Sequence, residues 1–120
     1  MNMTTSTRQL GDVTIVDISG RIVLGEESAA LRNLVSDLLS KQQNKILFNL
    51  RDVNYIDSSG LGHLVSAFTS VRKQGGELKL LHLTHKVHDL MQITRLYTVF
   101  HIMDDEAVAV KSFSPTGATA

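Results

Sequence analysis

The stretch that decides the fold reads Ile46-Leu47-Phe48-Asn49-Leu50, then Val53-Asn54-Tyr55-Ile56, then Asp57-Ser58-Ser59-Gly60-Leu61-Gly62. Residues 45–50 form a short, nearly continuous apolar run, which is typical of a strand covered on both faces. We expect a polar connection at Arg51-Asp52. Beyond Gly60, apolar residues recur at helical spacing up to Gln74. The stretch therefore predicts a central, parallel strand whose carboxyl end leads into a helix.

On either side of this stretch, strand and helix patterns alternate. Gly11-Asp12 suits a two-residue hairpin turn, Gly75 suits the left-handed end of a helix, and Thr84 suits a helix N-cap. The expected strands are 8–10, 13–18, 77–83 and 99–103, and the expected helices are 26–41, about 84–96, and one or two turns after the acidic residues 104–106.

This alternation predicts an α/β fold with a mixed sheet of four to five strands and helices packed against it. We expect one domain over residues 8–111, with a flexible N-terminal tail at 1–7 and a flexible C-terminal tail at 112–120, both rich in small polar residues. Sites in such sheets lie where strands end and helices begin, which here is Asp57 to Gly62.

Composition argues against several classes of function. The 120 residues carry twelve basic and twelve acidic side chains, and only 5% are aromatic, so we expect no direct nucleic-acid partner. There is no Cys, which removes disulfides and thiolate sites. There is neither a signal-peptide pattern nor an apolar run long enough to span a bilayer, so we expect a cytoplasmic protein with no membrane partner.

Asp57-Ser58-Ser59-Gly60-Leu61-Gly62 carries the expected chemistry. Two glycines in the first turn of a helix cost about 1 kcal/mol each against Ala. Either the turn packs tightly on the sheet, or a partner's backbone approaches it closely, and the sequence leaves both explanations open. Ser58 or Ser59 is expected to cap the helix. A phosphate there would face backbone amides and the positive end of the helix dipole, so the fold should tolerate it.

The same residues resemble the STAS domain, and within it the anti-sigma factor antagonists. The resemblance extends to Gly20-Arg21-Ile22, to residues 75–80 and to residues 96–100. It implies a STAS fold and a protein that, when unphosphorylated, binds an anti-sigma factor that is also a serine kinase, so that a sigma factor goes free. It makes Ser58 the phosphoacceptor, with Ser59 as second choice, and a serine phosphatase would restore binding. The expected partner-binding residues are Asp57, Ser58, Ser59, Gly60, Leu61, Gly62 and His63.

Three other functions compete with this one. A metal site at His82, His85 and His88 is disfavoured, since no carboxylate completes a ligand pattern, and we expect neither a metal nor a cofactor. Ser58 as a hydrolase nucleophile is disfavoured because the glycine spacing of a nucleophile elbow is absent, so we expect no enzyme. The serious alternative is a STAS scaffold, or a regulatory subunit of a signalling or transport complex, that is never phosphorylated.

Overall fold

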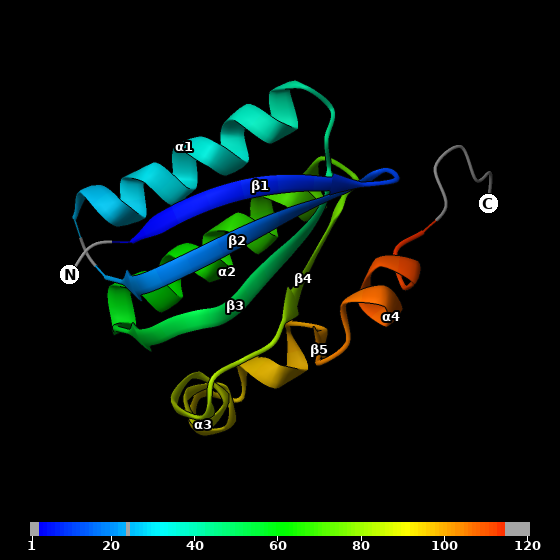
Figure 1. Ribbon diagram of the computed structural model, residues 1–120. Coiled ribbons are helices and arrows are strands. Elements are labelled where there is room, and N and C mark those ends of the chain that lie inside the picture. Colours follow the sequence, from blue (N-terminus) through cyan, green and yellow to red (C-terminus); the bar gives the residue numbers. More distant parts are fainter. Residues whose placement is uncertain (1–2, 24, 115–120) are drawn as a thin grey trace.

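The computed structural model describes residues 3–23 and 25–114, with the backbone alone for residues 26–28. Its sheet has five strands in the order β1-β2-β3-β4-β5, as Figure 1 shows. The strands are β1 (Thr4–Leu10), β2 (Val13–Ile22), β3 (Lys45–Ile56), β4 (Glu77–Leu81) and β5 (Ile102–Met103). The helices are α1 (Glu26–Ser40), α2 (Ser58–Lys73), α3 (His85–Thr94), the 3-10 turn η1 (Leu96–Thr98) and α4 (Glu106–Lys111).

The sheet is mixed, as the sequence predicts. β1 pairs antiparallel with β2 across a turn in which Gly11 has a φ of 60°. The pairs β2–β3, β3–β4 and β4–β5 are parallel. β3 lies at the centre, and α1 and α2 are the crossovers that connect parallel neighbours. The α/β class and the four- to five-stranded mixed sheet are therefore confirmed.

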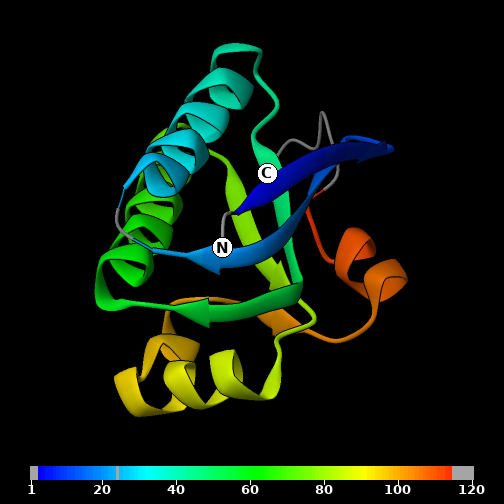
Figure 2. The ribbon, with the colours of Figure 1, turned by 60° about the vertical axis from the view of Figure 1, so that its left-hand side comes forward.

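The two faces of the sheet are covered differently. In Figures 1 and 2, α1 and α2 lie side by side over one face, while α4 stands against the other. Under α1 and α2 lies the larger core, which includes Phe48, Leu64 and Val71. Under α4 lies a smaller cluster that includes Leu47, Ala109 and Phe113. Because β3 contributes side chains to both clusters, its run from Ile46 to Leu50 is apolar at nearly every position.

β3 is one continuous strand, so the polar connection expected at Arg51-Asp52 is wrong. The backbone stays paired with β2, where Ser19 pairs with Asp52 and Ile22 with Ile56, but the pairing register shifts between Asp17 and Ser19 and again between Gly20 and Arg21. Arg51 and Asp52 are exposed and lie at the first of these shifts. Their polarity therefore marks an irregularity within the strand and not its end.

Three boundaries at the ends of the chain also differ from expectation. β1 begins at Thr4, inside the stretch expected as an N-terminal tail, because Thr4 pairs with Ser19. The last strand has only two of the five expected residues, because Val99 and Phe100 close the turn of η1 with backbone hydrogen bonds to the Leu96 carbonyl and so cannot begin the strand. Phe113, in the expected C-terminal tail, is 6% exposed. Residues 115–120 of that tail lie outside the described part of the chain.

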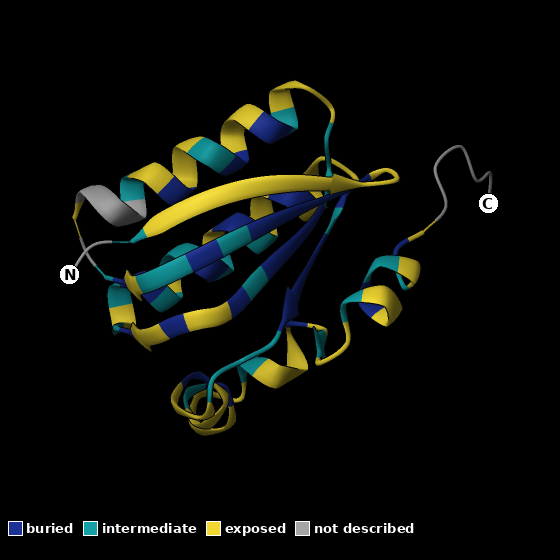
Figure 3. Cartoon of the chain, viewed as in Figure 1, coloured by how far each residue is buried: buried dark blue, intermediate teal, exposed yellow. Residues whose placement is uncertain are grey.

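Burial along the sheet confirms its central strands as the interior. In Figure 3, β4 and much of β2 and β3 are buried, while β1 is exposed along its whole length.

Over residues 3–23 and 25–114, no helix has both the length and the apolar character that crossing a membrane requires.

Candidate functional site

The candidate site lies where β2 and β3 end together and α2 begins. Ile22 and Ile56 are paired at the ends of these two strands. The next residue, Asp57, is extended and donates its backbone N–H to the carbonyl oxygen of Ile22 over 3.2 Å. Ser58 then begins α2. The structure thus places the Asp57 to Gly62 segment at the strand end where the sequence predicts a site.

The N-cap of α2 is Asp57, so the prediction that Ser58 or Ser59 caps the helix is wrong. The Asp57 Oδ1 accepts a hydrogen bond from the Gly60 N–H over 2.7 Å, and the Asp57 carbonyl accepts one from the Leu61 N–H over 2.9 Å. An acidic side chain at this position also suits the positive end of the helix dipole. Capping by Asp57 leaves both serines in the first turn, where the side chain of Ser58 is exposed.

The two glycines have different structural roles. A Cβ atom on Gly60 would collide with the backbone carbonyl of Ile22, whereas a Cβ atom on Gly62 would meet nothing within 4 Å. Tight packing of α2 on β2 therefore explains Gly60, which is buried. It does not explain Gly62, which is exposed and open to a partner.

The seven predicted partner-binding residues come together, but they do not form one surface. Gly60 is buried, and Leu61 is half-buried against the main core. Ser58 and Gly62 are exposed and four residues apart, so they lie on one face of α2. Asp57, Ser59 and His63 are half-buried around them. The accessible part of the predicted site is therefore a narrow strip centred on Ser58 and Gly62.

Two neighbours of this strip were not singled out from the sequence. Arg21 lies over the ring of Tyr55, with its guanidinium carbon 4.9 Å from the ring centroid, and Tyr55 is 45% exposed. The two residues are paired across β2 and β3, one residue before the strands end. The signal that could have pointed to this position is a large aromatic side chain, Tyr55, in the more polar second half of the strand.

The histidines considered as metal ligands point to different partners. The Nε2 atom of His82 lies 3.0 Å from a guanidinium nitrogen of Arg51. His85 lies 3.4 Å from the Asp89 carboxylate, one helical turn away. Over the residues that the structure describes, no three His, Cys, Asp or Glu side chains gather in a way that would hold a metal ion.

Comparison with known proteins identifies relatives along most of the chain. The profile of the STAS domain family matches residues 4–109. The anti-sigma-B factor antagonist of Bacillus subtilis is 35% identical over 102 residues, which cover 85% of this chain and 92% of that protein. The match of the profile over nearly all described residues agrees with the resemblance seen in the sequence.

Solved structures share the fold at lower identity. The crystal structure of an anti-sigma factor antagonist from Mycobacterium paratuberculosis has a TM-score of 0.81 at 18% identity, covering 92% of this chain and 93% of that one. The Bacillus protein SpoIIAA has been solved in an unphosphorylated form, with a TM-score of 0.70 at 16% identity over 90% of this chain and 96% of that one, and also in a phosphorylated form. At these identities the likeness establishes the STAS fold.

Proposed function

Because the chain belongs to the STAS domain family and, within it, to the anti-sigma factor antagonists, we propose that its unphosphorylated form binds an anti-sigma factor and so releases a sigma factor. The partner is an anti-sigma factor that is also a serine kinase, and it switches the complex off by phosphorylating Ser58. The observation that carries this proposal is an exposed serine directly after the capping Asp57, at the start of α2. Ser59, which is half-buried, is the second choice of acceptor.

A phosphate on Ser58 is compatible with the fold. Asp57 already caps α2, and no acidic side chain lies in the first turn of the helix. The phosphate would face the free backbone amides and the positive end of the helix dipole, both of which favour an anion. We therefore expect phosphorylation to leave the fold and its stability nearly unchanged.

The same phosphate opposes docking. It would stand beside the Asp57 carboxylate, where water in the free protein limits the repulsion of like charges about 4 Å apart to about 1 kcal/mol, whereas exclusion of that water by a docked partner raises the repulsion toward about 4 kcal/mol. Burying both groups under a partner adds a desolvation cost. Phosphorylation therefore weakens binding at a surface that stays folded.

The kinase supplies the chemistry in this scheme. ATP binds to the partner, and the present chain contributes the accepting hydroxyl of Ser58 and the surface around it. The absence of a side chain at exposed Gly62 lets the partner's backbone approach, while His63 borders the docked surface. A serine phosphatase restores binding, and the cycle runs in the cytoplasm.

The test is to measure binding to each candidate serine kinase of the same cell by titration calorimetry. We expect Ser58→Asp to weaken binding while the melting temperature stays close to that of the wild type, and Ser58→Ala to bind normally. Ser70→Asp places the same charge on exposed α2 surface three turns further on and serves as the matched control. Wild-type affinity of Ser58→Asp, or a large loss of its stability with unchanged binding, contradicts the proposal. If the protein binds a partner stably and no kinase phosphorylates it, the STAS scaffold is favoured instead.

A further inference from the structure

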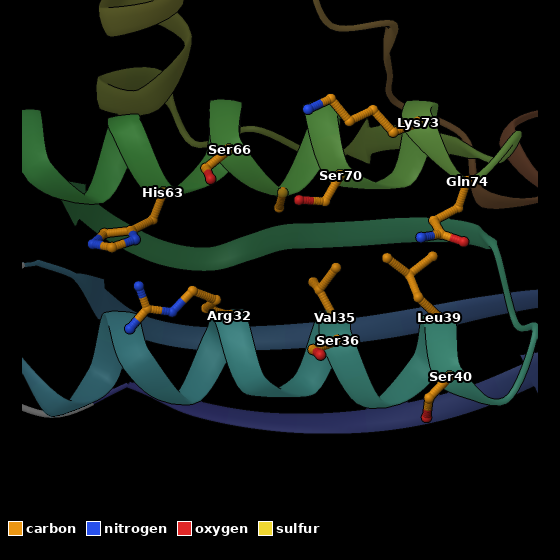
Figure 4. A pocket seen from close by; sticks show the side chains of 11 residues that line it. Arg32, Val35, Ser36, Leu39, Ser40, His63, Ser66, Ser70, Lys73 and Gln74 are labelled. Atoms are coloured by element: carbon orange, nitrogen blue, oxygen red, sulfur yellow. The ribbon is translucent and has the colours of Figure 1, made fainter.

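A groove of about 520 Å³ runs between α1 and α2, on the surface that faces away from the sheet. The helices follow adjacent parallel strands and therefore run in the same direction. Figure 4 shows residues of α1 facing residues of α2 along the gap. Its volume lies within the range of small-molecule sites, about 300 to 1,000 Å³.

The floor of the groove is apolar. It includes Val35 and Leu39 from α1 and Ala67 from α2. In Figure 4 the Val35 and Leu39 side chains point toward α2. Val35 and Ala67 are 3% and 7% exposed and Leu39 is half-buried, so a chain of CH₂ groups laid along the groove would cover mainly the open part of Leu39.

Positively charged side chains lie toward both ends of the groove, Arg32 at one end and Lys73 on the rim toward the other. Arg32 and His63 face one another across the gap at the end nearer the start of each helix, as Figure 4 shows. Among the residues that the structure describes, no carboxylate pairs with Arg32, and no Asp or Glu lines the groove. Ser36, Ser66 and Ser70 add hydroxyl groups along its rims. The groove is therefore complementary to an anion and to an apolar group along its floor, and the end where Arg32 and His63 oppose one another is the one where two side chains can contact the same anion.

We propose that this groove binds a free, single-chain amphipathic anion, an alkyl phosphate or alkyl carboxylate, with its charged group between Arg32 and His63. Its alkyl chain lies on Val35, Ala67 and Leu39. From Arg32 to Leu39 the helix rises about 10 Å, which accommodates a chain of medium length. The binding needs no phosphorylation and no protein partner. It is therefore a second site beside the proposed docking strip, which it adjoins at His63.

Binding is tested with octyl phosphate and octanoate, using amide chemical shifts of the full-length protein. We expect saturable shifts along α1 and α2, centred on Ser36, Ser66 and Ser70. Inorganic phosphate, which lacks the chain, and octanol, which lacks the charge, should each bind at least about tenfold more weakly. Absence of saturable shifts with both octyl probes up to ~1 mM, or equal binding of inorganic phosphate, overturns the proposal.

Two arginine variants distinguish binding in this groove from nonspecific attraction of the anion to positive charge on the surface. Arg32→Gln removes the unpaired guanidinium at the groove and should weaken octyl phosphate binding about tenfold. Arg72→Gln removes a guanidinium that lies over Phe68, outside the groove, and should leave binding within about twofold of the wild type. Both positions are exposed, so both variants should fold. Equal effects of the two substitutions, or no effect of Arg32→Gln, overturn the proposal.

Discussion

Gly60 of α2 lies against the backbone carbonyl of Ile22 at the end of β2, so closely that a single Cβ atom on the glycine would collide with it. The same carbonyl oxygen accepts a hydrogen bond from the Asp57 N–H, 3.2 Å away. One backbone group of β2 therefore fixes both the turn out of β3 and the height of α2 above the sheet. The exposed position of Ser58 depends on this close contact.

Alanine at each of the two glycines should have opposite effects on stability. Gly60→Ala forces α2 away from Ile22, and we expect it to lower the free energy of unfolding by about 2 kcal/mol or more. Gly62→Ala has open space for its methyl group and better helix propensity, so we expect a gain of up to about 1 kcal/mol. Urea unfolding of both variants measures these changes. Equal stability of the two variants would show that the contact with Ile22 does not set the position of the helix.

Gly62 also carries a binding prediction. If a partner's backbone approaches at this position, Gly62→Leu should fold and yet lose affinity for the kinase, because the added side chain occupies the space that the partner needs. Ser70→Leu, two turns further along the same helix, is the control for added apolar bulk on exposed α2 surface. Normal binding by Gly62→Leu would remove this glycine from the interface.

Asp57 should stabilise the protein through its cap. Asp57→Ala loses the hydrogen bond to the Gly60 N–H, and we expect the free energy of unfolding to fall by about 1 kcal/mol. Asp57→Asn keeps an oxygen acceptor at the same place and should recover most of that loss. Thermal unfolding of the two variants, side by side, separates the cap from the charge. A loss with Asn as large as with Ala would assign the effect to the charge.

The sequence predicts the architecture well because the pattern of apolar residues in β3 and α2 shows which faces of each element are buried. An exposed element has no such pattern. All seven residues of β1 are exposed, so no alternation marks its first half, and only pairing with β2 shows that it begins at Thr4. Arg51 and Asp52 were mistaken for a connection for the same reason. Exposed strand segments are specified by backbone hydrogen bonds, which side-chain patterns do not reveal.

Within the candidate site, residue types were predictable and individual roles were not. The structure has the predicted strand-to-helix junction at Asp57 to Gly62. Three adjacent residues, Asp57, Ser58 and Ser59, are all good caps, and only the backbone conformation shows that Asp57 is the N-cap and Ser58 the first helical residue. The contrast between Gly60 and Gly62 depends on Ile22, which is distant in sequence. Such contacts are set by the packing of α2 on β2.

The ion pairs of Arg8 should make the free energy of unfolding depend on pH. Its guanidinium hydrogen-bonds both the Asp17 carboxylate, at 2.6 Å, and the Glu106 carboxylate, at 2.8 Å, joining β1, β2 and α4. These bonds lower the pKa of Asp17 and the pKa of Glu106 from their ordinary values of 3.8 and 4.5. A lowered carboxyl pKa stabilises the folded state above its ordinary value, and this stabilisation is lost as the pH falls through the lowered pKa.

Arg8→Gln should therefore be less stable than the wild type at neutral pH, by about 1 kcal/mol for this partly exposed network. The difference should shrink as the pH falls below the ordinary pKa values of 4.5 for Glu106 and 3.8 for Asp17, and it should be lost once the pH passes below the lowered pKa values of the folded protein. Lys41→Gln removes an exposed pair with Asp37 in α1 and serves as the control, with little effect at either pH. A constant difference between Arg8→Gln and wild type across this range would contradict the assignment.

The most direct test of the proposed function is mass spectrometry of the protein after incubation with ATP and each candidate serine kinase of the same cell, with Ser58→Ala treated in parallel. The account predicts one phosphate on Ser58 of the wild type, delivered by the kinase that also binds the unmodified protein, and none on the variant. Phosphate that persists on Ser58→Ala would assign the acceptor to Ser59 or another hydroxyl. No phosphate with any kinase, despite stable binding to one of them, would contradict the phosphorylation switch.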